Sequence, residues 1–147
     1  LADMGVEPYL ISSCLEGVIA QRLVRRVCKS CAEPATPDET LYDEIAQAYP
    51  DRIKEATFLE GKGCPDCNFT GYRGRIAIFE IMVMDEDIRS LIVHQRPSNE
   101  IKQAAMQNGL VTLRRDGWRC VVEGKTTIDE VLRVARKTDF ESVKAGR

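Results

Sequence analysis

The sequence predicts an α/β fold in which an inserted metal-binding lobe separates two β-strands and a helical region follows. Two identical Cys-x-x-Cys pairs, Cys28–Cys31 and Cys64–Cys67, enclose the lobe. The apolar, β-branched segment RIAIFEIMVM follows the second pair and predicts a strand. Beyond Met84 the pattern becomes helical, with capping residues at the expected helix starts.

The composition indicates a globular protein. The chain has 147 residues, 44% of them hydrophobic and 30% charged, with a formal net charge of −2. These values differ from those of disordered or fibrous chains. Its apolar runs are shorter than the roughly 20 residues of a membrane span, and the lack of excess positive charge argues against a general nucleic-acid coat. The opening LADMG resembles the end of a helix closed by Gly5, so we expect a piece of a longer protein.

The N-terminal region is predicted to be a long helix followed by a short strand. In EPYLISSCLEGVIAQRLV, Pro8 suits the first turn of a helix, and apolar residues recur at three- and four-residue steps. Cys14 lies near that apolar face, which favours a small core residue over a metal ligand. The segment RLVRRV then predicts a strand that ends at Cys28.

A helix and a brief strand are predicted between the two cysteine pairs. Prolines interrupt the chain after Cys31, and Thr36 with Glu39 forms a capping-box pattern that opens the helix DETLYDEIAQAY. The segment ATFLEG is the predicted strand, and it leads to Gly63 and the second pair.

Two further helices are predicted directly after the strand RIAIFEIMVM. Asp85–Asp87 places carboxylates at the positive end of the helix DEDIRSLIVHQ. Ser98 is the expected cap of NEIKQAAMQ, and Asn108–Gly109 is its expected end. At the other end of the chain, a polar and frayed tail is expected from Lys137.

The tetrapeptide Gly124–Thr127 resembles the end of a phosphate-binding loop, but the rest of that motif is missing. The motif needs a glycine five positions before Gly124, where the chain has Arg119. We therefore expect Gly124 to end the helix TLRRDGWRCVVE, and Thr127 with Glu130 to form a capping box for IDEVLRVAR. The sequence assigns no catalytic and no nucleotide-binding residue in this chain.

The two cysteine pairs predict a metal site. A two-residue spacer lets a tight turn aim both sulfurs at one point, and two such turns supply the thiolates of a tetrahedral zinc site. The predicted ligands are Cys28, Cys31, Cys64 and Cys67. Four protein ligands leave no position for an activated water, so the expected role of the metal is structural.

Other uses of these cysteines stay open at this point. Iron fits the same tetrathiolate cage. Disulfides would need an oxidising compartment, and no signal peptide opens the sequence. A thioredoxin-like redox site would need one pair at a helix start within a βαβ unit, rather than two matched pairs.

A histidine and three arginines are also singled out. His94, the single histidine, is expected on the surface or half-buried on a helix. Two interpretations of Arg22, Arg25 and Arg26 stay open: a solvated strand edge, or contact with a phosphate or an acidic neighbouring subunit.

Three segments in this order resemble the C-terminal part of the secretion and pilus-assembly ATPases. They are DMGVEPYLISSCLEGVIAQRLVRRVCKSC, GCPDCNFTGYRGRIAIFEIM and DGWRCVVEGKTTIDEVLRV. The resemblance covers Leu1 to about Lys137, and it is closer to the type II secretion branch than to the type IV pilus branch.

This resemblance implies a RecA-like motor that forms a homo-hexamer at the cytoplasmic face of the inner membrane. There, ATP hydrolysis with Mg²⁺ drives assembly of a pseudopilus or pilus. The phosphate-binding loop and histidine box would precede Leu1, so this chain would be non-catalytic. It would hold structural Zn²⁺ on its four cysteines and contact other subunits or inner-membrane platform proteins, without nucleic acid and without direct membrane insertion.

The resemblance also implies how the chain is divided. The expected parts are the end of the RecA-like domain (1–27), the zinc-binding lobe (28–71), a returning sheet strand (72–84), a helical C-terminal subdomain (85–137) and a flexible tail (138–147). Two hypotheses compete with this one: a free-standing zinc-ribbon module that binds nucleic acid or protein, and a redox protein.

Overall fold

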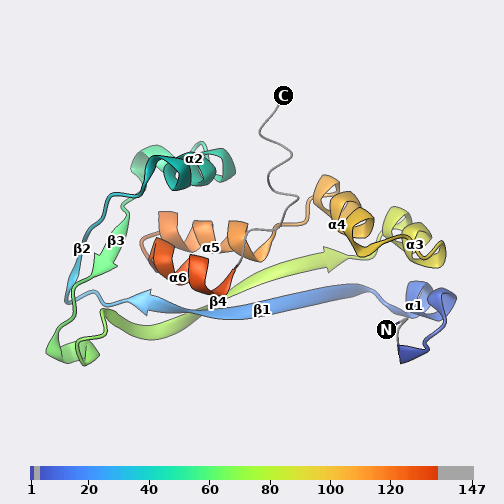
Figure 1. Cartoon of the computed structure of the whole chain (residues 1–147), viewed down its shortest axis with the longest axis horizontal. Coiled ribbons are helices and arrows are strands. Elements are labelled where there is room, and N and C mark those ends of the chain that lie inside the picture. The colour runs from blue at the N-terminus through green and yellow to red at the C-terminus, as the bar shows by residue number, and fades with distance from the viewer. Residues whose placement is uncertain (2–3, 136–147) are drawn as a thin grey trace. The chain divides into compact units, whose positions relative to one another are not determined.

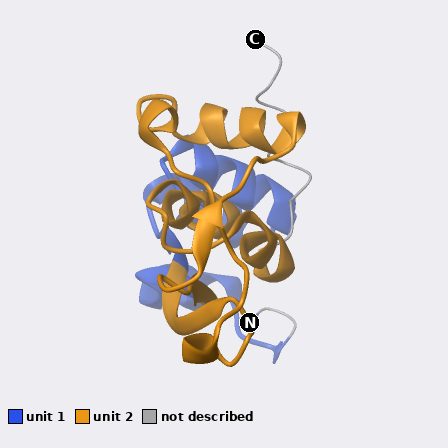
Figure 2. Cartoon of the chain, turned by 90° about the vertical axis from the view of Figure 1, so that its left-hand side faces the viewer, with its two compact units in different colours: residues 1–20, 79–112 blue, residues 21–78, 113–147 orange. Residues whose placement is uncertain are grey.

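The computed structural model describes residue 1 and residues 4–135 of the chain. The chain divides into two compact units, one of residues 1–20 and 79–112, the other of residues 21–78 and 113–147 (Figure 2). Among the described residues, no helix is both long and apolar enough to cross a membrane. The tail expected from Lys137 lies outside the described residues, and the domain boundaries expected from the sequence stay predictions.

Two long strands, β1 (Gly17–Val27) and β4 (Tyr72–Val83), pair in a two-stranded sheet and run in opposite directions (Figure 1). This confirms the strand predicted from RIAIFEIMVM, although β4 begins at Tyr72, three residues before that segment. The strands approach closely at Gly17, where an added Cβ would lie 3.0 Å from the backbone oxygen of Met82.

The long N-terminal helix predicted from the sequence is wrong. Helix α1 covers Pro8–Cys14 only, and residues from Gly17 onward belong to β1. The spacing of Val18 and Ile19 fits either structure, but β-branched side chains favour a strand, and β4 supplies the hydrogen-bonding partner that the sequence pattern does not show. Cys14 is exposed rather than part of a core, so that prediction is also corrected.

The first unit packs three helices around a small core. Helices α3 (Glu86–Val93) and α4 (Ser98–Gln107) follow β4, and α1 packs against α3. The core residues are Met84, Ile88 and Ala105.

The ends of the helices in this unit follow local chemistry. The carboxylate of Asp85 accepts a hydrogen bond of 2.8 Å from the backbone N–H of Ile88, so Asp85 caps α3. Ser98 is the first residue of α4 rather than its cap, because Pro97 occupies the capping position. Asn108 ends α4 as predicted, and Gly109 follows with a φ of +99° that suits a glycine.

The second unit contains the segment between the cysteine pairs and the last two helices. That segment forms β2 (Ala32–Pro34), α2 (Glu39–Ala48), the 3-10 helix η2 (Ile53–Glu55), β3 (Leu59–Gly61) and the 3-10 helix η3 (Pro65–Cys67). Strands β2 and β3 pair antiparallel. The two helices that follow α4 are α5 (Leu113–Val122) and α6 (Ile128–Val134). The predicted strand ATFLEG is therefore confirmed, in its last three residues.

Helix α2 begins differently from the prediction. Asp38, not Thr36, is its cap, and the Asp38 carboxylate accepts a hydrogen bond of 2.8 Å from the backbone N–H of Leu41. The Thr36–Glu39 capping box is wrong because Glu39 is already the first residue of the helix. Aspartate and threonine are both favourable N-cap residues. The residue type therefore does not decide between Thr36 and Asp38, and the start of the helix at Glu39 does.

One core joins α2 to β1, β4, α5 and α6. Its buried residues are Val24, Ile45, Ile78, Trp118, Cys120, Val121, Val122, Val131 and Ala135. A polar contact reinforces it: Arg114 forms a two-pronged ion pair with Glu44, and the indole N–H of Trp118 donates to the same carboxylate at 2.9 Å. The segment between the cysteine pairs therefore depends on α5 and α6 for its core.

The connection from α5 to α6 matches the prediction for Gly124–Thr127. Gly124 has a φ of +63° after the end of α5, and the Thr127 hydroxyl accepts a hydrogen bond of 3.2 Å from the backbone N–H of Glu130. The Glu130 half of the predicted capping box is wrong, because its carboxylate accepts hydrogen bonds from Arg25 and Arg133 and does not turn back to the start of α6.

Candidate metal centre

The four cysteines predicted as ligands come together in the second unit. The sulfur atoms of Cys28, Cys31, Cys64 and Cys67 all lie within 4.8 Å of one another. The Cys28–Cys64 and Cys31–Cys67 pairs are each 3.9 Å apart, and Cys64–Cys67 is 3.8 Å apart. A zinc ion with four sulfurs at about 2.3 Å in a tetrahedron places them about 3.8 Å apart. The donor set and its spacing therefore fit a tetrathiolate metal site.

Backbone hydrogen bonds hold the two cysteine turns against each other. The N–H of Cys28 donates to the carbonyl of Gly71 at 2.9 Å, which ties the end of β1 to the start of β4. Within the second turn, the N–H of Cys67 donates to the carbonyl of Cys64 at 3.1 Å. Asn68 closes this turn in the left-handed conformation, with a φ of 50°, as its residue type favours.

Backbone N–H groups also point at the sulfurs. Gly63 donates to Cys31 at 3.3 Å, while Cys64 at 3.2 Å and Gly71 at 3.3 Å both donate to Cys67. Hydrogen bonds of this kind stabilise a negative sulfur more than a neutral thiol. Burial raises the pKa of Cys67, but the N–H groups of Cys64 and Gly71 outweigh it and bring this pKa to about 6.

The pKa values of two other cysteines in the cluster shift in the opposite direction. Burial raises the pKa of Cys31 to about 12, against the opposing effect of the Gly63 N–H, and it also raises the pKa of Cys64. Four neighbouring thiolates are not stable together without a cation, because each like charge opposes the next. A bound divalent metal removes this conflict, and all four coordination positions are then filled by protein.

A close backbone crossing supports the cysteine turns. A Cβ added to Gly61 would lie 2.1 Å from the carbonyl oxygen of Gly71, and one added to Gly71 would lie 2.4 Å from that of Gly61. Gly71 also has a φ of +76°. The neighbouring N–H of Lys62 donates to the carbonyl of Cys31 at 3.1 Å, so a shift at Gly61 moves a metal ligand.

We expect Gly61→Ala to destabilise the protein by about 3 kcal/mol and to weaken metal retention, because backbone atoms must separate to admit the methyl group. Urea unfolding and zinc content measured against a chelator check this result. Gly109→Ala is the matched control: Gly109 has a φ of +99° with no atom within 4 Å of an added Cβ, so only backbone strain of about 1 kcal/mol is expected. Equal losses in the two variants would contradict a steric role for Gly61.

Among the described residues, the others singled out in the sequence do not belong to the cluster of four sulfurs. His94 is exposed, and its Nδ1 lies 2.8 Å from the carbonyl oxygen of Ser90 on its own helix. Arg22 and Arg26 are exposed on β1. Arg25, in contrast, belongs to a cluster around a buried carboxylate.

That carboxylate, Glu130 of α6, was not singled out as an ion-pair centre from the sequence. Its side chain is fully buried and receives Arg25 and Arg133, each with a shortest distance of 2.7 Å. The backbone N–H of Arg25 also donates to it at 2.9 Å. Burial raises the pKa of Glu130, but hydrogen bonds from Arg133 and Arg25 outweigh it and lower this pKa to about 2. The Arg25 guanidinium stacks on Tyr72, 4.0 Å from the ring centre.

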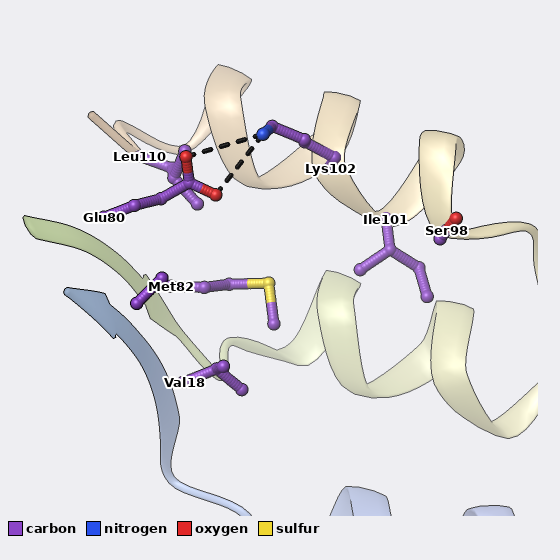
Figure 3. A pocket seen from close by; sticks show the side chains of 8 residues that line it. Val18, Glu80, Met82, Ser98, Ile101, Lys102 and Leu110 are labelled. Carbon is purple, nitrogen blue, oxygen red and sulfur yellow. Dashed lines mark hydrogen bonds and ion pairs between the residues drawn. The ribbon is translucent and has the colours of Figure 1, made fainter. Parts of the chain in front are cut away.

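A small cavity lies in the first unit, beneath α4 (Figure 3). Its volume is about 260 Å³, and an ion pair of 3.3 Å between Lys102 and Glu80 lies at its side. The lining residues are Val18, Ala20, Glu80, Met82, Ser98, Ile101, Lys102 and Leu110. The sequence does not predict this cavity, because β1, β4 and α4 meet only in the folded chain.

Comparison with known proteins assigns the chain to a family. The family model described as "Type II/IV secretion system protein" matches residues 1–133, which include all four cysteines. The chain belongs to this family. The resemblance to secretion and pilus-assembly ATPases inferred from the sequence is thereby confirmed.

Curated relatives from both branches are similar to the chain. Type II secretion system protein E of Pseudomonas aeruginosa is 44% identical over 137 residues, which cover 93% of this chain and 26% of the relative. Type IV pilus assembly ATPase PilB of Thermus thermophilus is 44% identical over 132 residues, or 90% of this chain and 15% of the relative. Type II secretion system ATPase E of Vibrio cholerae is 39% identical over 139 residues, or 94% and 27%. The chain therefore spans about a quarter or less of the length of these relatives.

Proposed function

We propose that the chain forms the C-terminal part of an ATPase that powers type II protein secretion. Homology to type II secretion and type IV pilus ATPases over most of the chain supports an origin in this group. The equal identity of 44% to a relative from each branch keeps pilus assembly as the alternative. In the proposed whole protein, RecA-like domains form a homo-hexamer at the cytoplasmic face of the inner membrane, and ATP and Mg²⁺ bind outside this chain.

Within that protein, this chain has a structural rather than a catalytic role. The closed cluster of four cysteines is the observation that carries this proposal. Zn²⁺ on Cys28, Cys31, Cys64 and Cys67 would tie the start of β4 to the end of β1 and fix the segment between them. A metal with four protein ligands supplies mechanical support and no open coordination position. The sequence Gly124–Thr127 caps helices and does not form a phosphate-binding loop.

Two measurements test the proposal. The purified chain should bind about one zinc per molecule and show no ATP hydrolysis, whereas the longer protein that contains it should hydrolyse ATP. ATP turnover by the chain that one of its own substitutions abolishes would contradict the non-catalytic role. Upstream sequence should contain a phosphate-binding loop and a histidine box within roughly 200 residues, and a sequence without them would contradict the assignment to the motor.

The branch is tested in the host cell. Deletion of the full-length gene should leave exported enzymes in the periplasm if the ATPase serves type II secretion. A loss of surface pili with normal export would instead assign it to pilus assembly.

A further inference from the structure

A group of basic side chains in the second unit lacks partners. Many lysines and arginines of the described chain form ion pairs, for example Arg114 with Glu44 and Arg119 with Asp116. Six exposed cations have no side-chain hydrogen-bond or ion-pair partner among the described residues, and one of them, Lys54, lies on η2. The other five are Arg22, Arg26, Lys29, Arg73 and Arg75, which we call the basic surface.

These five residues lie on adjacent segments. Arg22 and Arg26 are on β1, Arg73 and Arg75 are on the paired strand β4, and Lys29 follows the end of β1 (Figure 1). Gly74, between the two β4 arginines, lies beside Arg26: a Cβ added to Gly74 would be 3.9 Å from Cδ of Arg26, an ordinary van der Waals distance. Like charges this close repel one another, so the arrangement is at its most stable with an anion present.

The charge of the metal centre does not account for the basic surface. Residues 21–31 and 61–78 contain seven Lys and Arg and one Asp, a net charge of +6. Four thiolates around a divalent ion carry −2, so this region keeps a charge of +4 when the metal is bound. Two of these cations, Arg25 and Lys62, are paired with Glu130 and Glu60 outside the two stretches, which leaves a net charge of +2. An excess of positive charge therefore remains open to solvent.

The rest of the chain limits the size of the anion. Within the same unit, residues 32–60 contain eight Asp and Glu against two Lys and Arg, a net charge of −6. A nucleic acid or membrane surface that extends well beyond the basic surface meets this negative charge, and repulsion acts over about 8 Å at physiological salt. A short anionic segment can stay on the basic surface and avoid it.

An exposed aromatic side chain next to the basic surface indicates an apolar contact as well. Phe69, four residues before Arg73, is 74% exposed, and it has a φ of +58°. A positive φ is costly for a bulky residue. The backbone here is fixed by the approach of Gly63, where an added Cβ would lie 2.7 Å from the Phe69 carbonyl oxygen. The fold thus holds a large apolar side chain in solvent at the metal-binding turn.

We propose that the basic surface binds a short acidic segment of a partner protein, and that Phe69 contacts an apolar side chain of that segment. This inference goes beyond the proposed function and does not depend on it, because charge and exposure of this chain alone support it. The partner is defined by its chemistry: several Asp or Glu residues in an extended stretch with one aliphatic side chain among them.

Two labelled peptides test the proposal with the zinc-loaded chain under reducing conditions. Hexaglutamate and a glutamate peptide with one central leucine should both bind, and their binding should shift amide resonances of residues 22–29 and 69–75. In the variant Arg22→Gln/Arg26→Gln/Arg73→Gln, binding of both peptides should weaken by about tenfold. The control Arg52→Gln/Lys54→Gln/Arg96→Gln changes the net charge equally outside the basic surface, and it should bind as the unmodified chain does.

Phe69→Asn separates the apolar contact from the charges. Asparagine tolerates a positive φ, so the turn should keep its structure. This variant should lose affinity for the leucine-containing peptide while it keeps affinity for hexaglutamate.

Four outcomes would overturn the proposal. Equal weakening in the two triple variants would mean that only net charge matters. Tighter binding of short duplex DNA would assign the surface to nucleic acid, and tighter binding of phosphatidylglycerol vesicles would assign it to a membrane. Self-association that the basic-surface variant abolishes would assign it to a contact between copies of the chain.

Discussion

Replacement of Cys67 by Ser should release the metal and unfold the segment between the two cysteine pairs. Cys67 is buried, and its sulfur accepts hydrogen bonds from two backbone N–H groups while it lies 3.9 Å from that of Cys31. Structural zinc contributes on the order of 10 kcal/mol to the folding of small zinc domains, whereas whole domains are stable by about 5–15 kcal/mol. We therefore expect a loss of about 5 kcal/mol when one of the four ligands is removed.

Hydrogen exchange and zinc analysis check this prediction. Protection should fall throughout residues 28–71, and it should also fall in α5, because Ile45 of α2 and Trp118 of α5 share one core. Helices α3 and α4 belong to a different core and should keep their protection. Cys14→Ser is the matched control, since Cys14 is exposed and distant in sequence from the four ligands. Unchanged protection of residues 28–71 in Cys67→Ser would contradict a bracing role for the metal.

Replacement of Glu130 by Ala should strongly destabilise the second unit. It removes a fully buried carboxylate that joins α6 to two arginines and to the backbone N–H of Arg25. Removal of one partner from a buried ion pair costs about 3–5 kcal/mol, because the remaining charge is left buried without an opposite charge. We expect the lower end, about 3 kcal/mol, since both arginines can turn to solvent. Urea unfolding at neutral pH measures the loss.

The same carboxylate should make stability depend on pH. Its pKa is lowered from 4.5 in the unfolded chain to about 2 in the folded one. The stabilisation is therefore complete above about pH 4.5 and is lost as the pH falls toward 2. We expect about 2 kcal/mol over this range, after a reduction for the exposure of Arg25 and Arg133 to solvent.

Glu130→Gln isolates this effect from acid release of the metal. The variant keeps the shape of the side chain but cannot ionise, so its stability difference from the unmodified chain should shrink between pH 5 and pH 3. A difference that stays constant over that range would show that folding does not change the pKa of Glu130.

The sequence was sufficient to predict features that depend on local chemistry. The four cysteine ligands were predicted from their spacing, and Thr127 from its position before an apolar helical pattern. Asp85 was expected in the first turn of α3, whereas it is the capping residue before that turn. The extent of α1 was wrong because Val18 and Ile19 satisfy helical and strand spacing alike, and the partner strand β4 decided between them. A single sequence shows which segments can form a strand, but it does not show which distant strand pairs with them.

The polar contacts between residues far apart in the chain could not be predicted from the sequence, for a related reason. Glu130 was recognised for its place in a capping pattern, yet its carboxylate binds Arg25, more than a hundred residues earlier in the chain. Glu44 likewise meets Arg114 and Trp118 only because α2 packs on α5. Charged residues at such separations have many possible partners, and only the shared core selects among them.

The exposure of Cys14 offers a simple gauge of metal content. All six cysteines lie within the described residues; Cys120 is buried, four cysteines cluster, and Cys14 is the exposed one. A thiol reagent that modifies one group per molecule therefore reports a fully loaded preparation, and each additional fast-reacting group reports sites that have lost their ion. Cys14 can also carry a fluorescent dye without disturbing the metal centre. The same thiol chemistry therefore serves to measure metal content and to label the protein.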